Sequence, residues 1–135
     1  MPPPYLGQRD IHGLRVLVID DEAAVREGMH AVLSDWGCET ILAASAEEAL
    51  EKLQDGEPPH AIISDYRLRE GKDGAQAIES LRSTFGWAIP AIIVTGDTDP
   101  ARLREARASG NALMHKPVQP AKLRAYLRSV QRRKA

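Results

Sequence analysis

The chain has 135 residues, 43% of them hydrophobic, a size and composition typical of one compact domain with its own buried core. Its 18 Lys and Arg residues against 19 Asp and Glu residues give a net charge of −1. This excludes a general positive field that would attract a nucleic acid or an anionic membrane. The single cysteine, Cys38, excludes an intramolecular disulfide and fits a reducing compartment, so we expect a cytoplasmic protein.

The first residues differ in composition from the rest of the chain. They include three consecutive prolines, which favour an extended backbone, and they lack the basic and apolar stretches of a secretory signal. We expect a proline-rich leader or linker over 1–13, with a frayed terminus as the alternative, and one domain over 14–135. No apolar run reaches the roughly 20 residues of a membrane span, so we expect no membrane insertion.

Short apolar runs, rich in β-branched residues, recur along the predicted domain. Such runs are typical of strands that are buried on both faces, as in a parallel sheet, because half-exposed strands alternate apolar and polar residues. The second and the fifth runs carry a weaker pattern than the others. In chain order, we predict strands at 15–19, 39–44, 61–64, 91–94 and 111–115.

Segments with a helical period of apolar residues separate these runs. Ser45 and Glu48 predict a capping box at the start of one helix, and Asp99, which a proline follows, predicts the start of another. Gly37 and Gly110 stand where helices are expected to end. The helix after Asp99 has the thinnest apolar stripe, so we expect it to be the most loosely held.

Strand and helix alternate five times, which predicts an open α/β sheet with helices on both sides and right-handed crossovers. In such a sheet, ligands bind outside the carboxyl ends of the strands. All the predicted strands except the second end in polar residues with useful chemistry. In chain order, these residues are Asp20 and Asp21, then Asp65, then Thr95, then Lys116 followed by Pro117.

These strand ends predict a phosphoryl-transfer site. Three carboxylates that lie close together repel one another unless a cation neutralises them. Oxygen ligands favour a hard ion, and we expect Mg²⁺, with Mn²⁺ as a substitute. Lys116 offers a positive charge to a phosphoryl oxygen, and Thr95 offers a hydroxyl donor. Asp65, on the middle strand, is then the nucleophile.

Four motifs together resemble the receiver domain of two-component response regulators. They are VIDDE at 18–22, IISDYRL at 62–68, VTGD at 94–97 and HKPV at 115–118. The resemblance covers nearly the whole chain and implies a flavodoxin-like (βα)5 fold with strand order 2-1-3-4-5. It also implies that Asp65 accepts a phosphoryl group from a phosphohistidine on a sensor histidine kinase or phosphotransfer domain, after which the domain switches conformation.

The resemblance further implies the ligands of the metal. Asp21 is expected to bind Mg²⁺ directly and Asp20 through water, with Asp65 and the backbone carbonyl of Arg67 as the other protein ligands. Receivers lose the phosphoryl group spontaneously, and the side chains of Arg67 and Asp97 are expected to tune that rate. As an isolated domain, the chain is therefore expected to be a phosphoacceptor and not an enzyme.

The resemblance also implies how the site switches. Lys116 is expected to pair with the phosphoryl group, its peptide bond to Pro117 to be cis, and Thr95 to be the switch hydroxyl. Receivers commonly carry an aromatic residue three positions before the lysine, where this chain has Leu113. We therefore expect the switch to depend on Thr95 and on movement of the backbone. The loop after the phosphoacceptor also reaches its glycine, Gly74, about one residue late.

The longer loop with DYRL, and the HKPV ending, are similar to receivers at the C-terminal end of hybrid sensor histidine kinases. Together with the prolines near the start, they favour an excised or terminal receiver over a stand-alone single-domain regulator. We expect no direct contact with nucleic acid, and a homodimer is left open.

Two other families share some of these features. A phosphatase of the haloacid-dehalogenase type also uses an aspartyl nucleophile, but it needs a second acid two positions later, where this chain has Arg67. A flavin- or nucleotide-binding module on a flavodoxin-like sheet needs a glycine- or hydroxyl-rich phosphate loop after the first strand. This chain has DDEAAV there, and its negative charge repels a phosphate.

Overall fold

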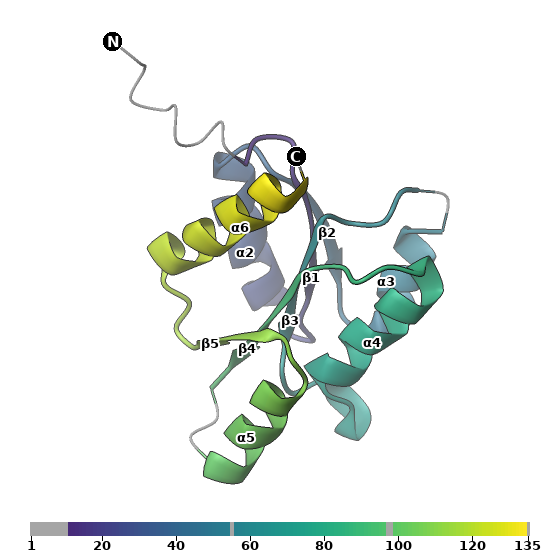
Figure 1. The fold of residues 1–135 in the computed structure, drawn as a ribbon, viewed down its shortest axis with the longest axis vertical. Helices are drawn as coiled ribbons and strands as arrows, with labels where there is room; N and C mark the ends of the chain where they lie inside the picture. The colour runs from purple at the N-terminus through teal and green to yellow at the C-terminus, as the bar shows by residue number, and fades with distance from the viewer. Residues whose placement is uncertain (1–10, 55, 97–98, 135) are drawn as a thin grey trace.

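The computed structural model describes residues 11–54, 56–96 and 99–134. Within them, five strands alternate with five α-helices, and one short 3₁₀ helix follows the third strand (Figure 1). The elements are β1 (Arg15–Ile19), α2 (Ala23–Asp35), β2 (Glu39–Ala43), α3 (Ala46–Lys52), β3 (Ala61–Asp65), η1 (Arg69–Gly71), α4 (Gly74–Phe85), β4 (Ala91–Thr95), α5 (Pro100–Ala108), β5 (Ala112–His115) and α6 (Pro120–Lys134).

The five strands form one parallel sheet in the order β2-β1-β3-β4-β5. The predicted fold class and strand order are thus confirmed. The register pairs Ile19 with Ser64, and Asp65 with Val94. Thr95, the last residue of β4, pairs with His115, the last residue of β5. The carboxyl ends of four strands therefore lie side by side at one edge.

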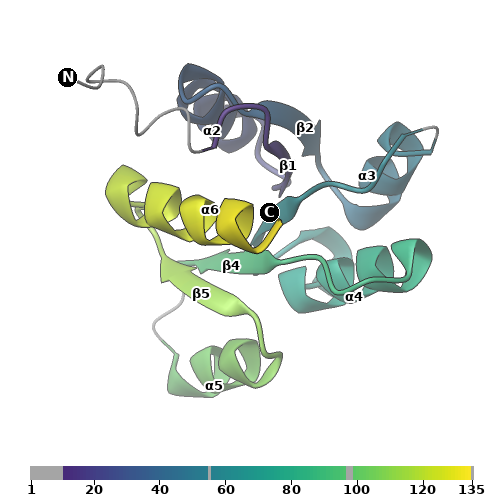
Figure 2. The same cartoon turned by 45° about the horizontal axis from the view of Figure 1, so that its top comes forward.

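Helices cover both faces of this sheet (Figures 1 and 2). Alternate side chains of each strand point to opposite faces, so Val18 of β1 belongs to the core cluster under α2 and α6, whereas Ile19 belongs to the cluster under α3, α4 and α5. The central strands β1, β3 and β4 are almost completely buried, which explains their unbroken apolar runs.

The helix ends follow the predicted signals with one exception. Asp99 accepts a hydrogen bond from the Ala101 N–H at the start of α5, and Gly37 and Gly110 adopt positive φ values of 83° and 81°. The Ser45 hydroxyl accepts from the Glu48 N–H, as one half of the capping box predicted for α3. The Glu48 carboxylate does not complete that box, because it pairs with Lys52 of its own helix.

The complete capping box is at a different helix. The Glu48 carboxylate lies 3.3 Å from the Lys52 ammonium, one turn along α3. At the start of α4, the Asp73 carboxylate accepts from the Gln76 N–H at 2.9 Å, and the Gln76 side chain accepts from the Asp73 N–H at 3.1 Å. This reciprocal pair fixes the start of α4 directly beside the end of β3.

Residues 11–13 of the predicted leader contact the domain, whereas the proline-rich residues before them lie outside the described residues. Ile11 is fully buried, and its carbonyl accepts a hydrogen bond from the Cys38 thiol. The Gly13 N–H donates to the Gly37 carbonyl at 2.8 Å. The boundary between leader and domain stays a prediction. In the described part of the chain, no helix has the length and apolar character needed to cross a bilayer.

Candidate functional site

The site is centred on Asp65, the last residue of β3. Every residue of this strand is buried, and the Asp65 side chain is only 9% exposed. The next residue is held in place as well, since the Tyr66 N–H donates to the Val94 carbonyl at 2.8 Å. The sheet thus presents the Asp65 carboxylate at its carboxyl edge with little freedom to move.

Two more carboxylates lie beside Asp65, from the end of β1. Asp20, Asp21 and Asp65 each offer a carboxylate oxygen, and these oxygens all lie within 4.8 Å of one another. The Asp20 carboxylate accepts from the Glu22 N–H at 2.9 Å, which fixes its orientation. The parallel register of β1 and β3 brings the three residues together, as the sequence predicted.

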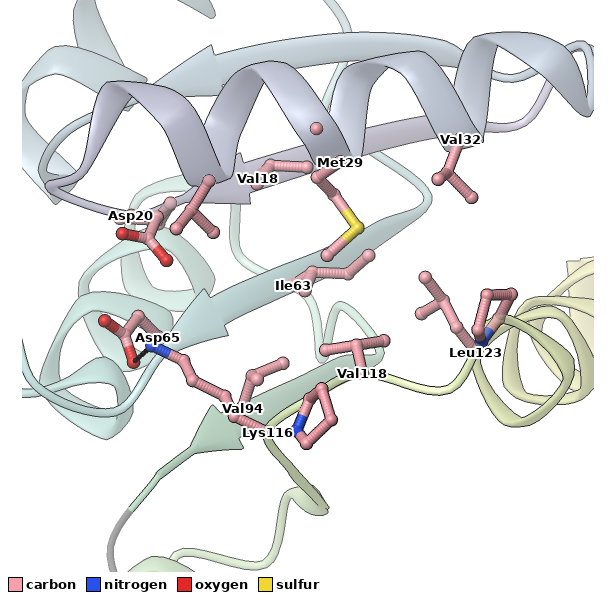
Figure 3. A pocket seen from close by; sticks show the side chains of 15 residues that line it. Val18, Asp20, Met29, Val32, Ile63, Asp65, Val94, Lys116, Val118 and Leu123 are labelled. Atoms are coloured by element: carbon pink, nitrogen blue, oxygen red, sulfur yellow. Dashed lines mark ion pairs between the residues drawn. The ribbon is translucent and has the colours of Figure 1, made fainter.

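Lys116 supplies the positive charge of the site. Its ammonium lies 3.2 Å from a carboxylate oxygen of Asp65, so the lysine side chain reaches from the end of β5 past β4 to the end of β3 (Figure 3). The Lys116 N–H donates to the Thr95 carbonyl at 2.8 Å, and the peptide bond from Lys116 to Pro117 is cis. The end of β5 is thereby tied to the end of β4, with the lysine side chain directed at Asp65.

A polar recess of about 500 Å³ opens over these groups. Thr95, at the end of β4, is buried and lines the recess. The exposed Arg67 also lines it, so both lie where the sequence predicted. The recess is large enough for a phosphoryl group and is bordered by residues from the carboxyl ends of four strands and the loops after them. Its full lining is Asp21, Glu22, Asp65, Arg67, Thr95, Gly96 and Lys116.

Burial makes the carboxylates costly to ionise. It raises the pKa of Asp65, and the nearby Lys116 ammonium offsets part of that rise. Burial likewise raises the pKa of Asp20, with the Asp65 charge adding to the rise and the hydrogen bond from Glu22 opposing it. One lysine thus balances only part of the negative charge, and the oxygen-only cluster suits a hard divalent cation.

Gly74 is a part of the site whose role the sequence did not reveal. It is the first residue of α4, and a Cβ at this position would lie 2.5 Å from the Asp65 carbonyl oxygen. Its N–H donates to the Tyr66 carbonyl at 2.7 Å. Only glycine allows α4 to begin this close to the end of β3. The sequence shows that Gly74 comes about one residue late in its loop, but no local signal indicates its close approach to the Asp65 carbonyl oxygen.

Two arginines near the aspartates were also not predicted. The Arg26 guanidinium donates to the Asp20 carbonyl at 2.6 Å, so α2 braces the loop after β1. The largely exposed Arg69 lies 3.7 Å from the Asp21 carboxylate. Neither arginine belongs to a recognisable motif, and both contacts depend on how the loops fold.

The remaining predicted residues are more distant from the chemistry. Leu113 lies in β5, is partly buried, and packs against the same core cluster as Tyr66. Asp97, predicted to tune the loss of the phosphoryl group, lies outside the described residues. Their roles stay predictions.

An apolar groove of about 310 Å³ adjoins the charged groups, and Figure 3 shows it from close by. Asp20, Asp65 and Lys116 lie at one end, and apolar side chains such as Met29 and Leu123 line the rest. The groove runs between α2 and α6 over one face of the sheet. Gly28, in the middle of α2, lines it, and a Cβ at this position would meet nothing within 4 Å.

Comparisons with known proteins agree with this geometry. Residues 16–128 match the family model of the response regulator receiver domain. The response regulator MprA of Mycolicibacterium vanbaalenii is 32% identical over 121 residues, which are 89% of this chain and 51% of that protein. The transcriptional regulatory protein AruR of Pseudomonas aeruginosa is 32% identical over 124 residues, 88% of this chain and 50% of that protein. The chain spans about half the length of these curated relatives.

Solved structures give the same match. The chemotaxis protein CheY4 of Vibrio cholerae has a TM-score of 0.73 and 30% identity, covering 87% of this chain and 98% of that one. A response regulator receiver protein from Pseudomonas putida has a TM-score of 0.75 and 29% identity, with 87% and 97% covered. A CheY-like receiver domain protein from Methanospirillum hungatei has a TM-score of 0.75 at 24% identity, which supports the fold alone.

Proposed function

Because this chain belongs to the response regulator receiver domains of two-component systems, we propose that Asp65 accepts a phosphoryl group from a phosphohistidine of a partner protein. A carboxylate oxygen of Asp65 attacks the phosphorus, and the P–N bond to the imidazole breaks with its electron pair returning to nitrogen. The products are an aspartyl phosphate and a free imidazole. The observation that carries the proposal is the 4.8 Å cluster of three carboxylates with Lys116 at 3.2 Å from Asp65.

The acidic cluster is suited to hold Mg²⁺, or Mn²⁺ in its place. Asp21 and Asp65 are the proposed direct carboxylate ligands, Asp20 is proposed to bind through water, and the backbone carbonyl of Arg67, beside the same recess, is the proposed fourth group. When bound, such an ion would neutralise the carboxylates and the phosphoryl oxygens that approach them. The raised pKa values of Asp20 and Asp65 support this, since two buried acids gain most from a cation.

Lys116 and Thr95 are proposed to bind the phosphoryl group once it is on Asp65. The Lys116 ammonium, which pairs with Asp65 before the reaction, exchanges that carboxylate for a phosphoryl oxygen. The Thr95 hydroxyl donates to another phosphoryl oxygen, which draws the end of β4 inward. Both residues are held by one backbone hydrogen bond, from the Lys116 N–H to the Thr95 carbonyl, so they respond together.

The two alternative functions receive no support. The relatives named above are response regulators or transcriptional regulators, and the matched family is a receiver domain, not a phosphatase or a flavin carrier. Arg67 occupies the position where a haloacid-dehalogenase-type phosphatase needs its second acid. We propose that the domain by itself takes and slowly loses one phosphoryl group.

The apolar groove supports a protein as the phosphodonor. It adjoins Asp65 and offers a surface on α2 and α6 against which a partner helix can pack while its phosphohistidine reaches the site. A histidine kinase or a phosphotransfer domain meets this description. The net charge of −1 favours no direct contact between this domain and nucleic acid, and we propose a cytoplasmic location.

The two curated relatives named above do not carry names of hybrid kinases, so the hybrid-kinase context predicted from DYRL and HKPV stays a prediction. Self-association of the domain also stays a prediction.

The assignment of Asp65 is tested with radiolabelled acetyl phosphate and Mg²⁺. We expect the wild-type chain to take up one label and Asp65→Asn to take up none. Asp35→Asn, which changes an exposed aspartate at the end of α2, is the matched control and should label normally. Full labelling of Asp65→Asn, or none of the wild type, would contradict the proposal.

The protein donor is tested at Gly28, where a side chain would project into open space. Glutamine there should preserve the fold, because glycine disfavours a helix by about 1 kcal/mol, yet it should obstruct the groove. For Gly28→Gln we expect normal labelling by acetyl phosphate but at least about tenfold slower transfer from a phosphotransfer domain that labels the wild type. Ala31→Gln, on the exposed side of α2, should change neither rate. Equal transfer to both variants would exclude the groove as the docking surface.

A further inference from the structure

One hydrogen bond connects the residue after Asp65 to the most weakly packed helix. The Tyr66 hydroxyl donates to the Glu105 carboxylate at 3.1 Å, and Glu105 lies on α5. We refer to this contact as the Tyr66–Glu105 link. It spans 39 positions of the chain and starts one residue from the proposed phosphoacceptor.

The Tyr66 end of the link is rigid. Its N–H donates to the Val94 carbonyl at 2.8 Å, and its carbonyl accepts from the Gly74 N–H at 2.7 Å, so the backbone is fixed to β4 and to α4 at once. The ring is 6% exposed and belongs to the core cluster on this face of the sheet. The hydroxyl of this buried ring is the donor of the link.

The Glu105 end is less firmly packed by comparison. Among the described residues of α5, only Ala106 is buried, and the other side chains are exposed except for the partly buried Leu103. A helix with so little buried surface owes a large share of its position to each specific contact. The link therefore connects a fixed residue of the site to a helix with little buried surface.

The connection of α5 to the site makes the link sensitive to phosphorylation. Only residues 96–99 separate Thr95 from the first residue of α5. An inward movement of Thr95 pulls on α5, while Tyr66 stays with β3 and α4. Because a hydrogen bond weakens steeply with distance and angle, a displacement of α5 breaks the link.

We propose that Tyr66 is a positioning residue, whose hydroxyl holds α5 through Glu105 in the unphosphorylated domain and releases it when Asp65 is phosphorylated. In this proposal, Tyr66 couples the site to α5, the role that other receivers give to an aromatic residue at position 113. This chain has a leucine at that position. The release half, in which phosphorylation of Asp65 frees α5, rests on the proposed function. The holding half, in which Tyr66 positions α5 in the unphosphorylated domain, does not.

The holding half is tested by amide hydrogen exchange on the unphosphorylated full chain. For Tyr66→Phe we expect exchange over residues 100–108 to become about threefold to tenfold faster, as one lost hydrogen bond predicts. Glu105→Ala should give the same acceleration, and Glu105→Gln, which keeps an acceptor, a smaller one. Tyr126→Phe, on α6 across the sheet, should leave α5 unchanged. An unchanged α5 in Tyr66→Phe overturns the proposal, as does an equal acceleration over residues 77–85 of α4, which marks general destabilisation.

The release half is tested after acetyl phosphate and Mg²⁺ treatment, with the phosphorylated fraction followed by intact mass. We expect wild-type α5 to reach the fast exchange of Tyr66→Phe on phosphorylation, and Tyr66→Phe to show little further change although it labels normally. A wild type that takes up label without change in α5 overturns release. A chain that takes up no label contradicts the proposed function instead, and the unphosphorylated comparison still decides whether Tyr66 holds α5.

Discussion

The helices α4 and α5 cover the same face of the sheet but are held very differently. Helix α4 buries Gly74, Ala77, Ile78 and Leu81, and it has a complete capping box at its start. Helix α5 buries only Ala106. Figure 2 shows the two helices as separate ribbons near β4 and β5. One flank of Asp65 is thus built into the core, and the other is attached to it at few points.

This difference suggests a division of labour. The α4 side holds the backbone beside Asp65, since the Gly74 N–H donates to the Tyr66 carbonyl and a Cβ at Gly74 would lie 2.5 Å from the Asp65 carbonyl oxygen. The α5 side follows Thr95 in the chain, and we propose that Thr95 and Lys116 move when a phosphoryl group enters the recess. A receiver needs both properties, because a site that is loose everywhere loses its geometry and one that is rigid everywhere transmits nothing.

The largest effect should come from truncating the core under α4. Ile78 is fully buried, so Ile78→Ala should lower the free energy of unfolding by about 2–5 kcal/mol. Leu103 of α5 is only partly buried, and Leu103→Ala should cost less than about 1.5 kcal/mol. Urea unfolding of the two variants measures both. Equal losses of stability would contradict the claim that α4 is packed into the core more firmly than α5.

A smaller loss of stability, with a larger loss of function, is expected at Gly74. An alanine methyl group would meet the Asp65 carbonyl oxygen at 2.5 Å, so α4 or the end of β3 must shift. Gly74→Ala should cost about 1–3 kcal/mol and slow labelling by acetyl phosphate. Gly28→Ala is the control, because its methyl group meets open space in a helix and should stabilise the domain by up to about 1 kcal/mol. Normal labelling of Gly74→Ala would show that α4 does not position Asp65.

The acidic cluster should give a still smaller effect that depends on pH. The pKa values of Asp20 and Asp65 are raised in the folded state, so folding opposes their ionisation. Their charges therefore lower stability above these raised values, and the cost is relieved as the pH falls through them toward the ordinary pKa of an aspartate. Without divalent cations, Asp20→Asn should raise stability at neutral pH by on the order of 1 kcal/mol.

The stability that Asp20→Asn gains should shrink as the pH falls from the raised pKa values toward the ordinary pKa of an aspartate. Mg²⁺ should stabilise the wild type more than the variant. Urea titrations at several pH values, with a chelator or with Mg²⁺, test both statements. A variant less stable than the wild type at neutral pH would show that Asp20 gains more from its hydrogen bond to Glu22 than it loses by burial.

The sequence was sufficient for the framework because the framework depends on local patterns. Unbroken apolar runs identified β1, β3 and β4, and the alternation with helices placed their polar ends at one edge. Asp20, Asp21, Asp65, Thr95 and Lys116 were therefore predicted before their contacts were known. The weaker run at β5 was also found, although Leu113 and Met114 are only partly buried.

What the sequence did not reveal depends on distances between separate elements. The approach of Gly74 to Asp65 and the Tyr66–Glu105 link join residues whose pairing follows no spacing rule. The capping box was assigned to Ser45 because both residue types fit, yet Glu48 pairs with Lys52, and the complete box forms at Asp73. Competing partners of similar energy decide such details, and a linear pattern does not rank them.

The most direct test of the account compares amide chemical shifts of the wild-type chain before and after phosphorylation by acetyl phosphate in Mg²⁺. Apart from the neighbours of Asp65, we predict the largest shift changes over residues 95–115, which contain Thr95, α5 and β5, and small changes over residues 77–85 of α4. Asp65→Asn under the same conditions should show neither. Changes spread evenly over both helices, or concentrated in α4, would contradict the claim that a rigid flank holds the nucleophile while the loosely attached flank responds.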